Sequence, residues 1–175
     1  MRVSIVTVSD SSAAGVRKDL SGPAIVELIQ QSKILRHASI SSTVTVPDER
    51  TLIEDVLIQQ CAHSDVVITT GGTGFAKRDV TPEATLNVVD RRCTGLEVAL
   101  HSRSLSATPM AALSRAVAGI RDSSLIVNFP GSVKAVKEYW EVLEPVLNHA
   151  VDLLSERDDG VLHSDMAKEA NANGH

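Results

Sequence analysis

A chain of 175 residues, 43% hydrophobic and 22% charged, suits one soluble domain with a substantial core. Its net charge of −5 argues against nucleic acid or an anionic membrane as the main partner, and aromatic residues at 2% are too few for base stacking. The two cysteines form no C-x-x-C motif and the six histidines no H-E-x-x-H motif, so neither predicts a metal site. We expect a cytoplasmic protein, since no apolar run approaches membrane length and the start lacks a signal-peptide core.

The predicted secondary structure alternates between strands and helices. Strand-like runs cover residues 3–8, 43–46, 66–69 and 125–128, and three of these four are largely β-branched and apolar. Helix starts are predicted at Ser21, at Asp48 or Glu49, at Thr81 and at Ser132.

This alternation predicts a three-layer α/β/α sandwich with a mainly parallel sheet, over residues 1–154. Pro145 is expected to kink or interrupt the last helix of that domain. Residues 155–175 are polar and have no apolar stripe, so we expect them to form a disordered tail.

A distinctive loop follows each predicted strand. Ser9 and Asp10 follow the first strand and Asp48 the second, whereas residues 71–74 follow the third and residues 130–132 the fourth. The carboxyl ends of parallel strands lie at one edge of a sheet, where ligands bind. We therefore expect these four segments to converge.

The segment Gly71-Gly72-Thr73-Gly74 supports two interpretations. Glycines let the backbone approach a ligand, free N–H groups bind anions, and Arg78 adds a fixed positive charge, which together suit a phosphate cradle. The spacing matches neither a Walker loop nor G-x-G-x-x-G, so a tight strand-to-helix turn remains open.

Two carboxylates accompany this loop. Asp79 alone could serve only as a favourable charge near a helix start, and Asp48 alone could be a helix cap. At one edge beside bound phosphates, however, the pair offers what magnesium needs to bridge protein and nucleotide. Ser114 and Arg115 fit either a polar helix turn or a contact with an anionic ligand.

Four sequence blocks carry a family resemblance. "TTGGTGFAKRDVTPEAT", "VPDE", "LSRAVAGIR" and "NFPGS" together resemble the molybdopterin adenylyltransferase family, which includes the G domains of gephyrin and of the plant molybdenum-insertion protein. The resemblance implies a trimer that uses magnesium to transfer AMP from ATP to the terminal phosphate of molybdopterin. It also implies a downstream molybdenum-insertion protein as a partner, while the net charge of −5 argues against nucleic acid and membrane.

The resemblance also implies roles for individual residues. Asp48 and Asp79 would be the catalytic carboxylates and would hold the metal. The nucleotide would contact Gly71, Gly72, Thr73, Gly74, Pro130, Gly131 and Ser132. Molybdopterin would contact Ser9, Asp10, Arg78, Ser114 and Arg115.

Two other functions remain open from the sequence. The same type of domain occurs in competence-damage proteins that cleave nucleotide pyrophosphates, which would make water the acceptor. A non-catalytic trimeric scaffold that binds the pterin is the second alternative. Turnover would distinguish these functions, whereas a trimeric state would not.

Overall fold

The sheet of the protein has six strands, four of them parallel. The structure, a computed structural model, describes residues 1–155, so the predicted tail lies outside the described residues except for Ser155. The strand order is β2-β1-β3-β6-β5-β4, and the pairs β1–β2, β1–β3 and β3–β6 are parallel. The strands are β1 (Arg2–Val8), β2 (Ser39–Val46), β3 (Val66–Thr70), β4 (Arg91–Arg92), β5 (Ala118–Arg121) and β6 (Ser124–Phe129).

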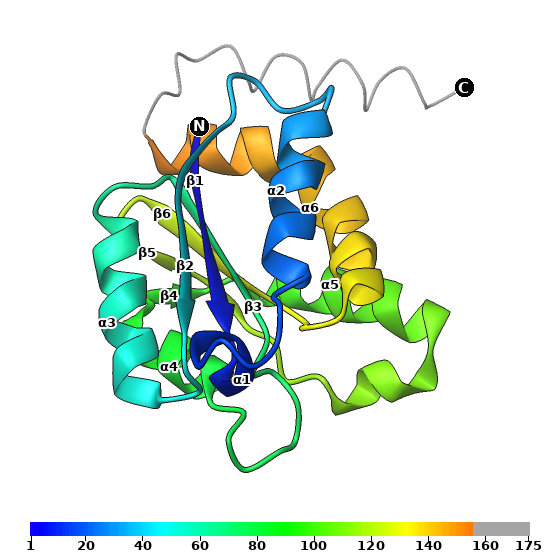
Figure 1. Ribbon diagram of the computed structural model, residues 1–175. Helices are drawn as coiled ribbons and strands as arrows, with labels where there is room; N and C mark the ends of the chain where they lie inside the picture. Colours follow the sequence, from blue (N-terminus) through cyan, green and yellow to red (C-terminus); the bar gives the residue numbers. More distant parts are fainter. Residues whose placement is uncertain (156–175) are drawn as a thin grey trace.

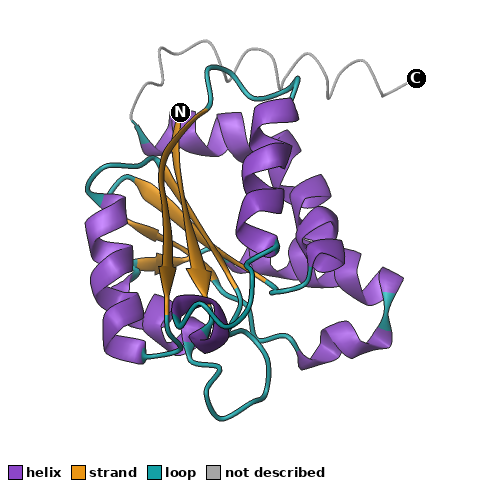
Figure 2. Cartoon of the chain, in the orientation of Figure 1, coloured by secondary structure: helices purple, strands orange, loops and turns teal. Residues whose placement is uncertain are grey.

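Helices cover both faces of this sheet (Figures 1 and 2). One face packs against α2 (Ser21–Gln31), α5 (Thr94–Ala107) and α6 (Val133–Leu154). The other face packs against α3 (Arg50–Cys61) and α4 (Thr81–Val88). The short α1 (Asp10–Ala13) follows β1, and the 3-10 helix η1 (Pro109–Leu113) follows α5. The predicted three-layer α/β fold with a mainly parallel sheet is confirmed.

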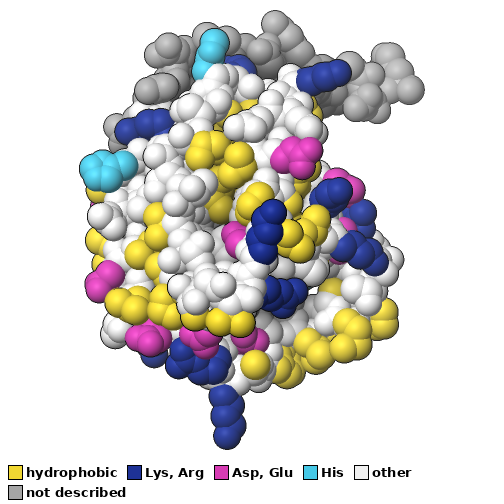
Figure 3. All heavy atoms as spheres, viewed as in Figure 1, with side chains coloured by type: hydrophobic (Ala, Val, Ile, Leu, Met, Phe, Trp, Pro, Cys, Tyr) yellow, Lys and Arg dark blue, Asp and Glu magenta, His cyan; other side chains and the backbone are white. Residues whose placement is uncertain are grey.

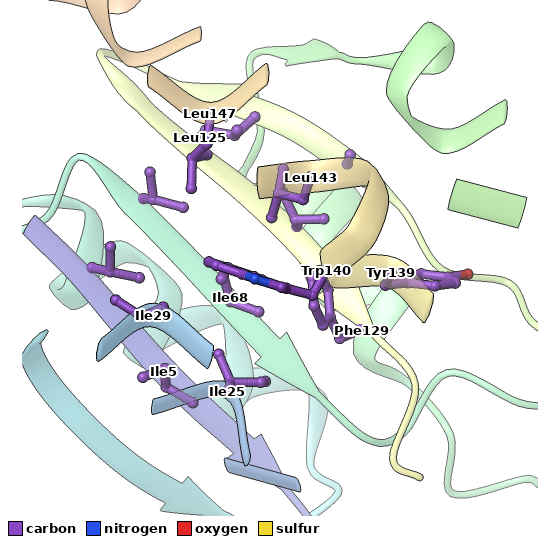
Figure 4. Packing of buried hydrophobic residues seen from close by; sticks show 14 of the residues in the cluster. Ile5, Ile25, Ile29, Ile68, Leu125, Phe129, Tyr139, Trp140, Leu143 and Leu147 are labelled. Atoms are coloured by element: carbon purple, nitrogen blue, oxygen red, sulfur yellow. The ribbon is translucent and has the colours of Figure 1, made fainter. Parts of the chain in front are cut away.

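Alternation along the central strands builds the two cores. Ile5 and Ile68 join the cluster under α2 and α6, whereas their neighbours Val6 and Val67 join the cluster under α3 and α4. Successive strand side chains point to opposite faces, so a strand covered on both faces is apolar throughout. In Figure 4, Trp140 lies across the cluster near Ile68.

The helix starts are only partly as predicted. Ser132 caps α6 through its Oγ, which accepts from the Ala135 amide at 3.2 Å, as expected. Ser21 does not cap α2, because the Asp19 carboxylate accepts from the Ser21 amide. Thr81 is the first residue of α4 and donates its hydroxyl to the Gly71 carbonyl, so it is not a cap either.

Pro145 does not interrupt α6, which continues to Leu154. Figure 1 shows the orange end of α6 running in a different direction from its yellow beginning, as the loss of one backbone hydrogen bond allows. No helix within residues 1–155 is both long and apolar enough to span a membrane.

The edge beyond β6 was not predicted. β5 and β4 continue the sheet as antiparallel strands, and β5 joins β6 through a tight turn with Asp122 at a φ of 51°. β5 has four residues, including a glycine, and β4 has two, so neither produces a detectable apolar run. Tertiary contact makes them strands, because β5 pairs with β6 and β4 pairs with β5.

Candidate functional site

The predicted loops meet in one cleft of about 450 Å³ at the carboxyl ends of β1, β3 and β6. All four loops contribute to its wall. Residues from the predicted site that line it are Ser9, Asp48, Gly71, Gly72, Asp79, Gly131 and Ser132. The expected convergence of four distant segments is therefore observed, and the cleft has the size of a small-molecule site.

A glycine turn forms the floor of this cleft. Gly71 and Gly72 have φ angles of 98° and 63°, which other residues adopt only under strain. A side chain at Gly71 would also collide with the Val8 carbonyl, and one at Gly72 with the Thr81 hydroxyl. The turn therefore requires glycine at both positions, and it brings bare backbone to the cleft.

Glycines also make room for the two carboxylates. A Cβ atom at Gly72 would lie 2.9 Å from Asp48 Oδ1, and one at Gly74 would lie 2.8 Å from Asp79 Oδ2. Asp79 Oδ2 is fixed by the Ala76 amide at 3.1 Å. Both carboxylates line the cleft together with the glycine turn, which is the arrangement that a shared metal site requires.

Asp48 is linked to Asp10 by a reciprocal pair of hydrogen bonds. The Asp10 amide donates to Asp48 Oδ2 at 2.8 Å, and the Asp48 amide donates to Asp10 Oδ1 at 3.0 Å. This pairing joins the loops after β1 and β2. Partial burial raises the pKa of the Asp48 carboxyl above its usual range, against the hydrogen bond from Asp10, and the charges of Asp10 and Asp79 raise it further.

The Arg78 side chain forms an ion pair with Asp10. Its Nε and one terminal nitrogen donate to the two Asp10 oxygens at 2.9 and 2.7 Å, and both side chains are about half exposed. The hydrogen bonds from Arg78 hold the pKa of the Asp10 carboxyl below its usual range. Neither residue lines the cleft, so a ligand contact from Arg78 requires this pair to rearrange.

Arg115 supports the loop from behind. Its Nε donates to the Gly74 carbonyl at 2.8 Å and a terminal nitrogen to the Asp79 carbonyl at 2.6 Å, while the other terminal nitrogen pairs with the Glu83 carboxylate. Its amide also donates to the Thr73 carbonyl at 2.8 Å. The guanidinium is therefore fully engaged by protein groups.

The remaining predicted residues lie outside the cleft wall. Ser114 ends η1, and the Thr73 side chain is buried. The Pro130 carbonyl accepts from the Thr70 hydroxyl at 2.8 Å. The carbonyls of Thr73 and Gly74 both accept from Arg115, so this part of the loop is held by protein groups.

The sequence reasoning missed one part of the wall. Arg17, Lys18 and Asp19 line the cleft from the segment before α2. Asp19 Oδ1 accepts from the amides of Ser21 and Gly22, so it is the true cap of that helix. The sequence did offer a signal for this part of the wall. Arg17 and Lys18 directly precede Asp19, which lies two residues before the predicted helix start at Ser21.

Two carboxylates suit a metal shared with a ligand. Residues 1–155 contain no cluster of three or more histidine, cysteine or acidic side chains arranged for a metal ion. Magnesium is usually held by one or two carboxylates together with waters and substrate phosphates. Asp48 and Asp79 therefore fit magnesium that arrives with a phosphate ligand.

Comparisons with known proteins agree on one family. Residues 4–149 match the family described as "Probable molybdopterin binding domain". Molybdopterin adenylyltransferase from Helicobacter pylori J99 is 42% identical over 156 residues, covering 88% of each chain. Gephyrin from Dictyostelium discoideum is 44% identical over 89% of this chain, which spans only 23% of gephyrin.

A solved structure supports the same assignment. The molybdopterin biosynthesis enzyme MoaB from Thermus thermophilus superposes with a TM-score of 0.81 at 42% identity, covering 89% of this chain and 96% of that one. The family match itself extends over most of the sequence. This chain belongs to the family described as "Probable molybdopterin binding domain".

Proposed function

We propose that the protein is an enzyme of molybdenum cofactor biosynthesis that transfers AMP from ATP to the terminal phosphate of molybdopterin. The observation that carries this proposal is the shared cleft: the glycine turn at Gly71 and Gly72 faces it together with Asp48 and Asp79. The Helicobacter relative, similar over almost its whole length, bears the name of this activity.

The cleft offers a place for each part of the reaction. The nucleotide phosphates would lie on the turn at Gly71 and Gly72, close to Gly131 and the start of α6 at Ser132, where the helix dipole favours anions. The Gly71 amide itself donates to the Phe129 carbonyl at 3.2 Å. The phosphate of molybdopterin would approach from the loop after β1, which carries Ser9 and Asp10.

The reaction joins two anionic groups, so positioning and charge neutralisation dominate its catalysis. An oxygen of the molybdopterin phosphate attacks the α-phosphorus of ATP, and the bond from that phosphorus to the β-bridging oxygen breaks to release pyrophosphate. Asp48 and Asp79 would hold magnesium, which neutralises phosphate charge when bound. The Asp79 loop is kept in place by Arg115.

We extend the proposal to assembly and location. Exposed apolar side chains gather on α5 and η1, where Figure 3 shows a run of hydrophobic atoms at the lower right. They include Val98, Leu105, Met110 and Leu113. Such a surface supports the homotrimer that the family resemblance implies. We place the enzyme in the cytoplasm, with a molybdenum-insertion protein downstream.

A product assay tests the activity. Purified protein is mixed with molybdopterin, ATP and magnesium, and adenylylated molybdopterin and pyrophosphate are measured. We expect both products in equal amounts and only when the pterin is present. Hydrolysis of ATP or dinucleotides without the adduct would favour the pyrophosphatase alternative. Tight pterin binding without turnover would favour the scaffold.

A further inference from the structure

The cleft wall carries more negative than positive groups. Three carboxylates line it, from Asp19, Asp48 and Asp79. The two arginines that the sequence offers for a phosphate are neutralised elsewhere, since Arg78 pairs with Asp10 and Arg115 with Glu83. Magnesium on Asp48 and Asp79 would offset only two of these three negative charges, so a polyphosphate in the cleft gains from a further source of positive charge.

Arg17 and Lys18 are the two cations in the cleft wall. Both side chains are exposed, and neither forms an ion pair or a side-chain hydrogen bond within residues 1–155. Figure 3 shows basic side chains around the hollow at the centre right of the molecule. Unlike Arg78 and Arg115, these two side chains can meet an anion without breaking an existing contact.

The backbone of this segment is held on both sides. The amides of Val16 and Arg17 donate to the Ser11 carbonyl at 2.9 and 3.1 Å. On the other side of Lys18, Asp19 Oδ2 accepts from the Thr7 hydroxyl at 2.6 Å, which ties the segment to β1. The two cations therefore extend from a fixed base, which lowers the entropy cost of ordering them on a ligand.

We propose that Arg17 and Lys18 form a phosphate-binding subsite on the α2 side of the cleft. It would take a phosphate or pyrophosphate group of a substrate and offset the charge of the three aspartates. This inference rests on the proposed function for the identity of the substrate. Arg17 would bind phosphate oxygens with its planar fork, and Lys18 would act as a point charge.

Pyrophosphate is the direct probe. Its binding is measured by calorimetry, at fixed magnesium and two salt concentrations, for the wild type and for R17Q/K18Q. We expect the double variant to bind about tenfold more weakly and to lose part of the salt dependence. The matched control is K33Q/K137Q, which removes two exposed lysines that do not line the cleft. The control should stay within about twofold of the wild type.

Titrations with ATP and with molybdopterin then identify the source of the phosphate. The ligand whose affinity falls in R17Q/K18Q, but not in the control, is the one that uses the subsite. Equal binding of pyrophosphate and both substrates by the double variant and its control would overturn the subsite, as would a wild type that binds none of them.

The two proposals fail separately. Absence of the adenylylated product from the wild type, with pyrophosphate binding still dependent on Arg17 and Lys18, would overturn the proposed function and keep the subsite. Normal product formation by the wild type, together with unchanged phosphate binding and product formation by R17Q/K18Q, would overturn the subsite and keep the proposed function. Thermal melts verify that each variant folds, and the exposure of all four side chains predicts little change.

Discussion

The two walls of the cleft differ in how their charges are held. On the loop side, the Ala76 amide fixes Asp79, and the nearby Arg78, which does not line the cleft, is paired with Asp10. On the α2 side, Asp19 is also tied down, but the neighbouring Arg17 and Lys18 extend free of partners within the described chain. We propose that the two walls have different roles: the fixed Asp79 would serve the reacting centre, and the unpaired Arg17 and Lys18 would bind the ligand.

The largest expected effect comes from removing the charge of the loop wall. Asp79→Asn keeps the shape of the side chain but loses the negative charge that would hold magnesium, so turnover should fall about a thousandfold. The adenylylation assay measures this. Asp55→Asn, an exposed change on α3, is the control and should leave turnover unchanged. Normal turnover of the Asp79 variant would remove its catalytic assignment.

The next effect comes from the backbone of the same wall. Gly72→Ala places a side chain at a φ of 63° and into the Thr81 hydroxyl. We expect a loss of about 2–3 kcal/mol in unfolding free energy, measured by urea denaturation. Gly95→Ala is the matched control, because a Cβ there meets nothing within 4 Å inside a helix. Gly95→Ala should leave the unfolding free energy unchanged or raise it slightly. Equal losses of unfolding free energy in both variants would show that the backbone at Gly72 is not strained by a side chain.

Arg115 distinguishes support from ligand binding. Arg115→Lys keeps a charge beside Glu83 but cannot reach both loop carbonyls, so we expect kcat to fall about tenfold while the KM for molybdopterin stays within about twofold. Arg103→Lys, in an ion pair with Glu141, is the control and should change neither constant. A raised KM for molybdopterin with unchanged kcat would instead show that Arg115 contacts the pterin.

The smallest effect is on stability and depends on pH. The raised pKa of Asp48 means that its ionised form is disfavoured in the folded state. Asp48→Asn should therefore raise the melting temperature slightly at neutral pH, and the gain should vanish as the pH falls below the unfolded pKa, where the wild-type side chain is protonated in both states.

Asp10→Asn should behave in the opposite way, since Arg78 lowers the pKa of Asp10. It should lose stability at neutral pH, and this loss should vanish at low pH. Melting curves from acidic to neutral pH test both signs. Asp48→Asn destabilising the protein at neutral pH would show that burial does not control this carboxyl.

Much of the site could be predicted from the sequence, because the predicted strands and the recognised motifs both indicated which loops would meet. β-branched runs identified the parallel strands, and the rule that their carboxyl ends share an edge brought Asp48 and Asp79 to one cleft. The contacts of Arg78 and Arg115 were not accessible, because an arginine in a motif looks the same whether it meets a ligand or a protein carboxylate. Arg17 and Lys18 lie outside the recognised blocks.

The layered α/β fold, the glycine turn after β3 and the family can be predicted from the residues alone, because they depend on local periodicity, backbone freedom and a contiguous motif. Three features become evident only in the folded chain: the antiparallel edge of β4 and β5, the Asp19 cap of α2, and the cations of the cleft wall that have no protein partner within residues 1–155. Those features depend on contacts between segments that are distant in the sequence. Packing geometry decides which side chains pair there, and residue type alone does not reveal it.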